Sequence, residues 1–203
     1  MEYAKFLLSG QDKKSLSIIR NTLVTGGHVL VAYSDNTSNI LRYVRSVEPD
    51  LIIVEASVNF KELRQSIEVI DEELLAACIL LVDSRNDEIF ELIRKSRVVT
   101  YIAKPVFEEV LLQIADLTLA NFRRIRDYEN KLRRLNDTLE SRKIIEKAKW
   151  LLVEQDGMKE LDAYEAIKRR SRDNRITMRD IAEAIILVRS DYSDSKKAEE
   201  KPK

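Results

Sequence analysis

The N-terminal half of the chain alternates short apolar runs with segments of helical periodicity. Apolar residues such as Leu16, Ile19 and Leu23 recur every three or four positions in the helical segments. The apolar runs lack polar alternation, which is typical of strands buried on both faces of a parallel sheet. These runs are Lys5–Leu8, Val29–Tyr33, Leu51–Val54, Ile79–Val82 and Thr100–Ala103. Strands separated by helices predict a doubly wound, flavodoxin-like α/β domain over residues 1–107.

From about Val106 the pattern becomes one continuous helix in which seam positions recur with a 3-4 spacing. These positions are Leu111, Ile114, Thr118, Asn121, Ile125, Tyr128, Leu132, Leu135 and Leu139. A heptad seam of this length predicts a coiled-coil linker helix over residues 108–140 that joins two copies of the chain. The alternative is a single amphipathic helix that packs on the α/β domain.

Two further helices follow the glycine that ends the long helix. Gly157 suits the residue after a helix, and a second helix is expected from Lys159 to Ser171. A third begins at Thr177, whose hydroxyl can cap it together with Asp180. We therefore predict an all-helical module over residues 141–189 and a disordered tail over residues 190–203.

Composition narrows the class of protein. Among 203 residues, 35 acidic side chains balance 35 basic ones, so any nucleic-acid surface has to be local. The single Cys78 and the single His28 allow neither a disulfide framework nor a zinc site, and no glycine-rich phosphate loop is present. No signal peptide or membrane-spanning run is visible, which predicts a cytoplasmic protein with no membrane partner. We expect no enzyme activity, no cofactor and no metal.

The α/β region resembles the receiver domain of response regulators over nearly its whole length. The resemblance rests on the run from Pro49 to Val54 and on Tyr101-Ile102-Ala103-Lys104-Pro105. It implies three acids that hold Mg²⁺, one of them a phosphoacceptor Asp, a Ser or Thr on the fourth strand and a Lys on the fifth. Lys104 matches that lysine.

The other receiver positions depart from the family pattern. Glu55 stands at the phosphoacceptor position, Asp83 stands at the hydroxyl position, and Ser9-Gly10-Gln11 replaces the acidic pair. Magnesium requires several oxygen ligands in near-octahedral order. We therefore expect a degenerate site in which Lys104 pairs permanently with a carboxylate and mimics a fixed signalling state. The alternatives are a polar cluster with no regulatory meaning and genuine phosphotransfer.

The C-terminal region resembles the ANTAR family of RNA-binding transcription antiterminators over about fifty residues from Leu139. The matching residues are Ala148-Lys149, Ala163-Tyr164, Ile167-Lys168, Ser171, Ile181-Ala182-Glu183 and Ile185. The resemblance implies a three-helix module at the end of a coiled coil, which binds paired hairpin loops in an mRNA leader. Trp150 stands where the family often has Gly, and this side chain either fills a gap in the core or stacks on a base.

The charge pattern supports an RNA partner, because basic clusters attract phosphate and hairpin loops expose base edges. The predicted RNA-binding residues are Ala148, a small side chain permitting close approach, together with Lys149, Lys168, Ser171, Arg172, Arg175 and Arg179. The expected partners are hairpin RNA, a second copy of the chain, and a regulatory protein or small ligand at the receiver-like domain. Two alternatives are a solvated charged face and a dimeric protein-interaction adaptor with no nucleic-acid binding.

Overall fold

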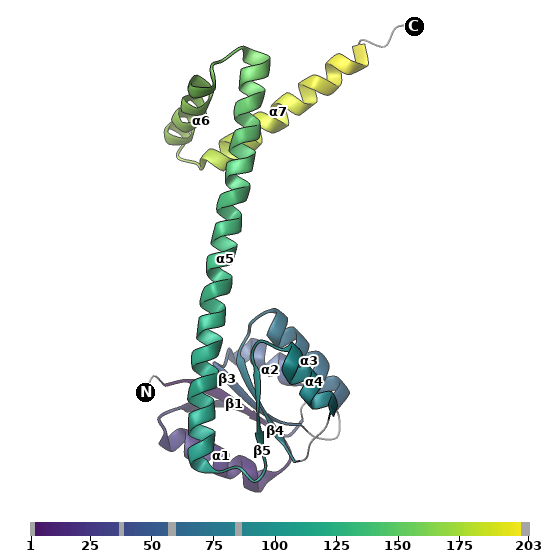
Figure 1. The fold of residues 1–203 in the computed structure, drawn as a ribbon, viewed down its shortest axis with the longest axis vertical. Coiled ribbons are helices and arrows are strands. Elements are labelled where there is room, and N and C mark those ends of the chain that lie inside the picture. The colour runs from purple at the N-terminus through teal and green to yellow at the C-terminus, as the bar shows by residue number, and fades with distance from the viewer. Residues whose placement is uncertain (1–2, 37–38, 57–59, 84–86, 200–203) are drawn as a thin grey trace. The chain divides into compact units, whose positions relative to one another are not determined.

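A computed structural model describes residues 3–36, 39–56, 60–83 and 87–199, and for residues 190–199 it describes the backbone alone. The chain divides into two compact units, Met1–Glu129 and Asn130–Lys203. Each unit is described by itself (Figure 1).

The first unit is built around a parallel sheet. Its strands are β1 (Lys5–Ser9), β2 (Val29–Ser34), β3 (Leu51–Glu55), β4 (Ala77–Val82) and β5 (Val99–Ala103). The five strands lie in the order β2-β1-β3-β4-β5, and every neighbouring pair is parallel. This order confirms the predicted doubly wound, flavodoxin-like fold.

Helices cover both faces of this sheet. They are α1 (Lys13–Thr25), α2 (Ile40–Val47), α3 (Phe60–Glu72), α4 (Asp87–Lys95) and the first part of α5 (Glu108–Asp156). The ribbon shows α1 and α5 on one side and α2, α3 and α4 on the other (Figure 1). Because all five strands run parallel, their carboxyl ends meet at one edge of the sheet. Open α/β sheets place their sites at this edge.

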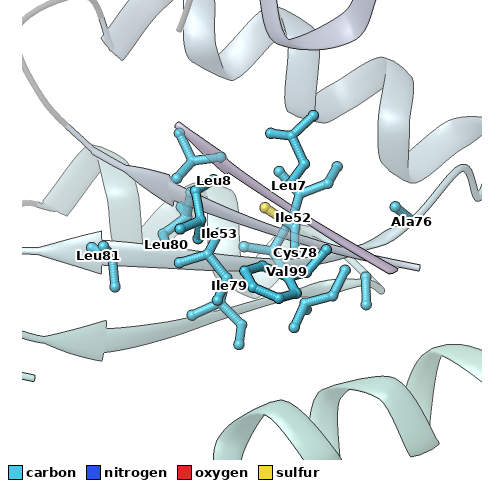
Figure 2. Close-up of a cluster of buried hydrophobic side chains, with 14 of the residues drawn as sticks. Leu7, Leu8, Ile52, Ile53, Ala76, Cys78, Ile79, Leu80, Leu81 and Val99 are labelled. Carbon is cyan, nitrogen blue, oxygen red and sulfur yellow. The ribbon is translucent and has the colours of Figure 1, made fainter. Parts of the chain in front are cut away.

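Strands β1, β3 and β4 carry the core, which explains their unbroken apolar runs. Leu7, Ile52 and Cys78 are completely buried and lie within one cluster (Figure 2). Burial raises the pKa of the Cys78 thiol, with a smaller contribution from the Asp71 carboxylate. Cys78 therefore behaves as a core hydrophobe and not as a reactive thiol.

The first part of α5 belongs to this core. Leu111, Leu119 and Phe122 are buried in it, and Thr118 shares a 2.9 Å hydrogen bond with Thr100 on β5. The coiled-coil prediction is therefore wrong for the beginning of residues 108–140, where the alternative of an amphipathic helix packed on the α/β domain is correct. The α/β unit consequently extends to Glu129 and not to residue 107. Periodicity alone does not reveal which surface buries an apolar stripe.

In the next stretch of α5, the residues at the predicted seam positions are exposed to solvent. Leu132, Leu135 and Leu139 are 55%, 60% and 53% exposed, although large aliphatic side chains usually lie inside. Self-association of two copies through this exposed stripe remains a prediction.

The second unit is a three-helix module formed by the end of α5, α6 (Glu160–Asn174) and α7 (Met178–Glu199). Its core contains Ala148, Leu152, Ala163, Ile167 and Ala182. Small residues on each helix let the three backbones approach closely. This confirms the predicted module.

Local signals end and begin these helices as expected. Gly157 follows α5 with a φ of +66°, a conformation that favours glycine. Before α7, the Asp180 carboxylate accepts from the backbone N–H of Thr177 at 3.0 Å, and the Thr177 hydroxyl accepts from the N–H of Asp180 at 3.1 Å. This reciprocal pair confirms the predicted capping box.

The predicted disordered tail needs correction at its beginning. Helix α7 continues through Glu199, well past the expected end at residue 189. The stretch from Ser190 to Glu199 contains no Gly or Pro and ends in Lys, Ala and Glu, which favour helix. Residues 200–203 lie outside the described part of the chain. Among the described residues, no helix is long and apolar enough to cross a membrane.

Candidate functional site

The receiver-like site lies at the carboxyl edge of the sheet and is centred on the Lys104 ammonium. Glu55, at the end of β3, hydrogen-bonds Lys104, which follows β5. Lys104 Nζ also lies 3.1 Å from an oxygen of Asp83 and 3.7 Å from one of Asp12. The structure therefore brings together the three predicted residues of the degenerate site, Glu55, Asp83 and Lys104.

The extra methylene of Glu55 turns its carboxylate back toward the loop between β1 and α1. Glu55 Oε2 accepts from the backbone N–H of Gln11 at 2.7 Å and from that of Asp12 at 3.0 Å. A Cβ at Gly10 would lie 2.7 Å from both Cβ and Oε2 of Glu55. Gly10 is thus the residue that lets Glu55 reach this loop.

Hydrogen bonds decide the charge state of this buried cluster. Burial opposes ionisation of Glu55, but the Lys104 ammonium and the N–H groups of Asp12 and Gln11 outweigh it and lower the pKa of the carboxyl. For Lys104, burial likewise favours the neutral form, while Glu55 and Asp83 raise the pKa above its ordinary value. Both groups are therefore charged across the physiological range.

Asp12 is the member of the cluster that sequence reasoning missed. Its carboxylate caps α1, accepting from the N–H groups of Lys14 and Ser15 at 3.2 Å each and from the Ser15 hydroxyl. The Ser15 bonds lower the pKa of Asp12, with a further contribution from Lys104. The Asp-x-x-Ser spacing at a helix start could have revealed it. Among the described residues, no group of three or more His, Cys, Asp or Glu is arranged to hold a metal ion.

In the second unit, two of the predicted RNA-binding residues are internal. Ala148 is completely buried against the module core, so its small side chain permits close approach of helices. Lys149 is only 6% exposed, and its ammonium lies 2.6 Å from both Glu146 and Glu160. These carboxylates raise the pKa of Lys149. Lys149 therefore links α5 to α6, and its ammonium is engaged within the module.

Three more predicted residues have partners within the module. Lys168 pairs with Glu165 at 2.9 Å, and Arg179 pairs with Glu183 at 2.8 Å. The Ser171 hydroxyl donates to the carbonyl of Ile176 at 2.6 Å and closes the turn after α6. These three residues are therefore engaged within the module, and their contact with RNA remains a prediction.

Arg172 and Arg175 are the predicted residues that remain open to solvent. Both are exposed, and no ion pair of their side chains is found among the described residues. Arg169 lies one helical step from Arg172 on the same exposed face of α6. Arg175, with a φ of +56°, ends α6 in a left-handed conformation. The cationic surface of this unit thus centres on the C-terminal end of α6.

Trp150 is 53% exposed, which does not support the interpretation that it fills a gap in the core. It follows Leu132 by eighteen positions, which is five turns of an α-helix. Trp150 therefore lies on the face of α5 that carries the exposed leucines, while Ala148 and Leu152 face the module core.

Comparisons with known proteins agree with this division. The family model described as "ANTAR domain" matches residues 133–186. The transcriptional regulatory protein PdtaR of Mycobacterium tuberculosis is 27% identical over 160 residues, which cover 79% of this chain and 78% of that protein. The nitrate regulatory protein of Klebsiella oxytoca is 33% identical over 78 residues, covering 38% of this chain and 20% of that protein.

Solved structures match the first unit in fold. The signal receiver domain of a modulated diguanylate cyclase from Desulfovibrio desulfuricans G20 has a TM-score of 0.53 at 17% identity, covering 60% of this chain and 98% of that one. The isolated REC domain of RcsB from Salmonella enterica serovar Typhimurium has a TM-score of 0.50 at 12% identity, covering 60% and 99%. At these identities the likeness shows a receiver fold alone.

The Glu55–Lys104 pair predicts a pH-dependent stability. Because folding lowers the pKa of Glu55 below 4.5, its contribution is present above that pH and is lost as the pH falls through the folded value. Glu55→Gln should lower the unfolding free energy of the first unit by about 3 kcal/mol at neutral pH. The deficit relative to wild type should shrink below pH 4.5. Amide hydrogen exchange of β3 measures this unit separately.

The exposed Arg64–Glu68 pair on α3 supplies the matched control, since Glu68 is 47% exposed. Glu68→Gln should change the unfolding free energy by about 0.5 kcal/mol or less. A Glu55→Gln deficit that stays constant through the acid range would show that the pair does not govern stability.

Proposed function

Because residues 133–186 form an ANTAR domain behind a receiver-like α/β unit, we propose that this chain is an RNA-binding transcription antitermination regulator. The observation that carries the proposal is that the ANTAR match coincides with a separately folded three-helix module. Relatives that match this chain are named as regulatory proteins. The proposed ligand is the loop of RNA hairpins in an mRNA leader, and the role requires no catalytic residue.

The cationic end of α6 supplies the contact in this proposal. From Arg169 to Arg175 the chain holds four arginines and a single acid, Asp173. Guanidinium groups contact phosphate and base edges in single-stranded loops, and RNA hairpins present both. On α5, Lys143 and Lys147 are exposed and lie one turn apart, which adds positive charge to the module.

A homodimer fits the exposed leucines of α5. Leu132, Leu135 and Leu139 keep the spacing of a coiled-coil seam, and Trp150 continues the same face. Pairing two copies through this face would bring two RNA-binding modules together. Two linked modules gain affinity for a pair of hairpins through effective concentration.

In this proposal the receiver-like unit does not respond to phosphorylation. Both oxygens of the Glu55 carboxylate are already hydrogen-bonded, one to Lys104 and the other to the N–H groups of Gln11 and Asp12. Lys104, which would contact the phosphoryl group, is held in place by Glu55 and Asp83. A regulatory protein or a small ligand would then provide the input, with the Lys104–Glu55 pair holding one fixed state.

The RNA-binding role is tested with full-length protein and RNA containing two adjacent stem-loops, across a salt series. Wild type should prefer this RNA to loop-free RNA duplex and to duplex DNA. The double variant Arg172→Ala, Arg175→Ala should bind more weakly, with the slope of log K against log salt reduced by about 2 because two phosphate contacts are lost. Arg94→Ala, which removes an exposed arginine of α4, is the matched control. Wild-type protein that binds no RNA at any salt would favour the adaptor.

The dimer is tested by placing a charge in the exposed stripe. Leu135→Glu should convert a dimer of 23.6 kDa chains into monomers, because a buried carboxylate facing its symmetry mate is strongly unfavourable. Sedimentation equilibrium measures the mass directly. Leu161→Glu, at a position on α6 that is 74% exposed, should leave the mass unchanged. A Leu135→Glu protein that remains dimeric would place the contact elsewhere.

Phosphorylation is tested by incubating the protein with acetyl phosphate and Mg²⁺ and measuring the intact mass. The mass should stay unchanged, because Glu55 is held by Lys104 and by backbone N–H groups. A Glu55→Asp variant tests whether the shorter side chain is sufficient to restore the chemistry. A gain of one phosphate on Glu55 of the wild type would contradict the fixed state.

A further inference from the structure

A groove in the second unit lies beside the cationic end of α6 and was not anticipated from the sequence. It has a volume of about 310 Å³ and is lined by Leu152, Arg170, Ile181, Ala184, Ile185, Val188 and Arg189. That volume is near the lower end of the range for ligand sites, about 300 Å³. All of these residues belong to the three-helix module, so the groove lies within one compact unit.

The floor of the groove is aliphatic and partly open to solvent. Ile181 and Ile185 form its buried base, while Val188 is 67% exposed and Ala184 is also exposed. These four residues recur at helical spacing along one side of α7. A continuous aliphatic surface next to an arginine-rich segment favours a ligand with a flat apolar part and a negatively charged part.

One of the two arginines at the groove is held rigidly. The guanidinium of Arg189 donates to both oxygens of Asp156 at 2.6 Å and to Gln155 Oε1 at 3.1 Å. This bidentate bond lowers the pKa of Asp156, and the charge of Arg170 contributes to the same shift. A guanidinium fixed in this way presents a planar face, on which an aromatic ring can stack.

The second arginine at the groove, Arg170, has a guanidinium that a ligand can reach. Arg170 is exposed, and no hydrogen bond or ion pair of its guanidinium is found among the described residues. Asp156 is the acid whose charge reaches Arg170, and Arg189 already neutralises that carboxylate. The groove therefore combines a fixed planar cation, an uncompensated cation and an aliphatic floor.

We propose that this groove takes an unstacked nucleobase from an RNA loop, which stacks on the Arg189 guanidinium over the aliphatic floor while Arg170 contacts the adjacent phosphate. The inference rests on the proposed RNA-binding function and names the element that would read the loop. A looped-out base offers the planar apolar ring, and its phosphate offers the negative charge. The residues that line the groove include no acid that would hold a basic peptide.

The experiment begins with full-length wild-type protein and a pool of RNA stem-loops whose short loops are randomised. Wild type should enrich particular loop sequences. On one enriched RNA, each loop nucleotide is then replaced in turn by an abasic one. Removal of the base that enters the groove should weaken binding about tenfold, the usual effect of losing one stacked base. If wild type enriches no RNA, the proposed function fails and this inference falls with it.

Val188→Trp fills the groove and tests the site itself. This variant should bind the enriched RNA about tenfold more weakly than wild type and should lose its sensitivity to the abasic replacement. Leu161→Trp, which adds the same side chain at an exposed position of α6 outside the groove, should behave as wild type. A Val188→Trp protein with wild-type affinity and the same abasic sensitivity would overturn the proposal, although RNA binding would stand.

Arg170→Ala is a second variant that cannot fail by disturbing the core, since its side chain is exposed. It should reduce the salt slope by about 1 and keep the sensitivity to the abasic position, because phosphate and base contacts are separate. Sedimentation equilibrium of Val188→Trp and Arg170→Ala tests whether a second copy of the chain, and not a nucleobase, occupies the groove. If Val188→Trp converts a dimer into a monomer, a second copy of the chain covers the groove and the nucleobase assignment is wrong.

Discussion

The structure depends on the long helix α5, which buries one apolar face near its start and another near its end. Near its start the apolar face is buried in the α/β core through Leu111, Leu119 and Phe122. Near the end of α5 a different face, which carries Ala148 and Leu152, is buried in the three-helix module. Between these stretches Leu132, Leu135 and Leu139 have no cover within the described chain. Exposed leucines on consecutive turns are costly in water, and this cost is the physical reason for the homodimer that we propose.

The sequence predicted the backbone of this protein well, because the signals for it are local. Buried strands such as Leu51–Glu55 require only a short apolar run, and the capping box of Thr177 and Asp180 requires only spacing. The role of α5 was harder to predict, since a seam with heptad spacing is satisfied equally by the sheet of its own domain and by a partner helix. The helix up to Glu199 differs from the predicted disordered tail, because helix propensity outweighs the charge and polarity of this stretch.

The candidate RNA surface shows where prediction from residue types fails. Lys149 and Arg179 carry the charges that a phosphate ligand needs, but Lys149 pairs with Glu160 and Arg179 pairs with Glu183. A ligand would have to displace these carboxylates, which reduces the gain from each contact. For Arg170 and Arg172 no direct ion pair is found in the part of the chain that the structure describes, and this difference depends on tertiary positions that spacing does not encode. Charge along a sequence therefore indicates that a cationic surface exists, while its position follows from the pairing of acids.

The same reasoning explains the degenerate receiver site. An Asp at the end of β3 would leave the β1–α1 loop free, whereas Glu55 reaches two of its backbone N–H groups and requires Gly10 to do so. Lys104 completes the arrangement, because its charge compensates the desolvation of Glu55. In the regulator that we propose, Glu55 and its supporting glycine form a permanent structural link at this position, and the input comes from a surface or ligand other than phosphate.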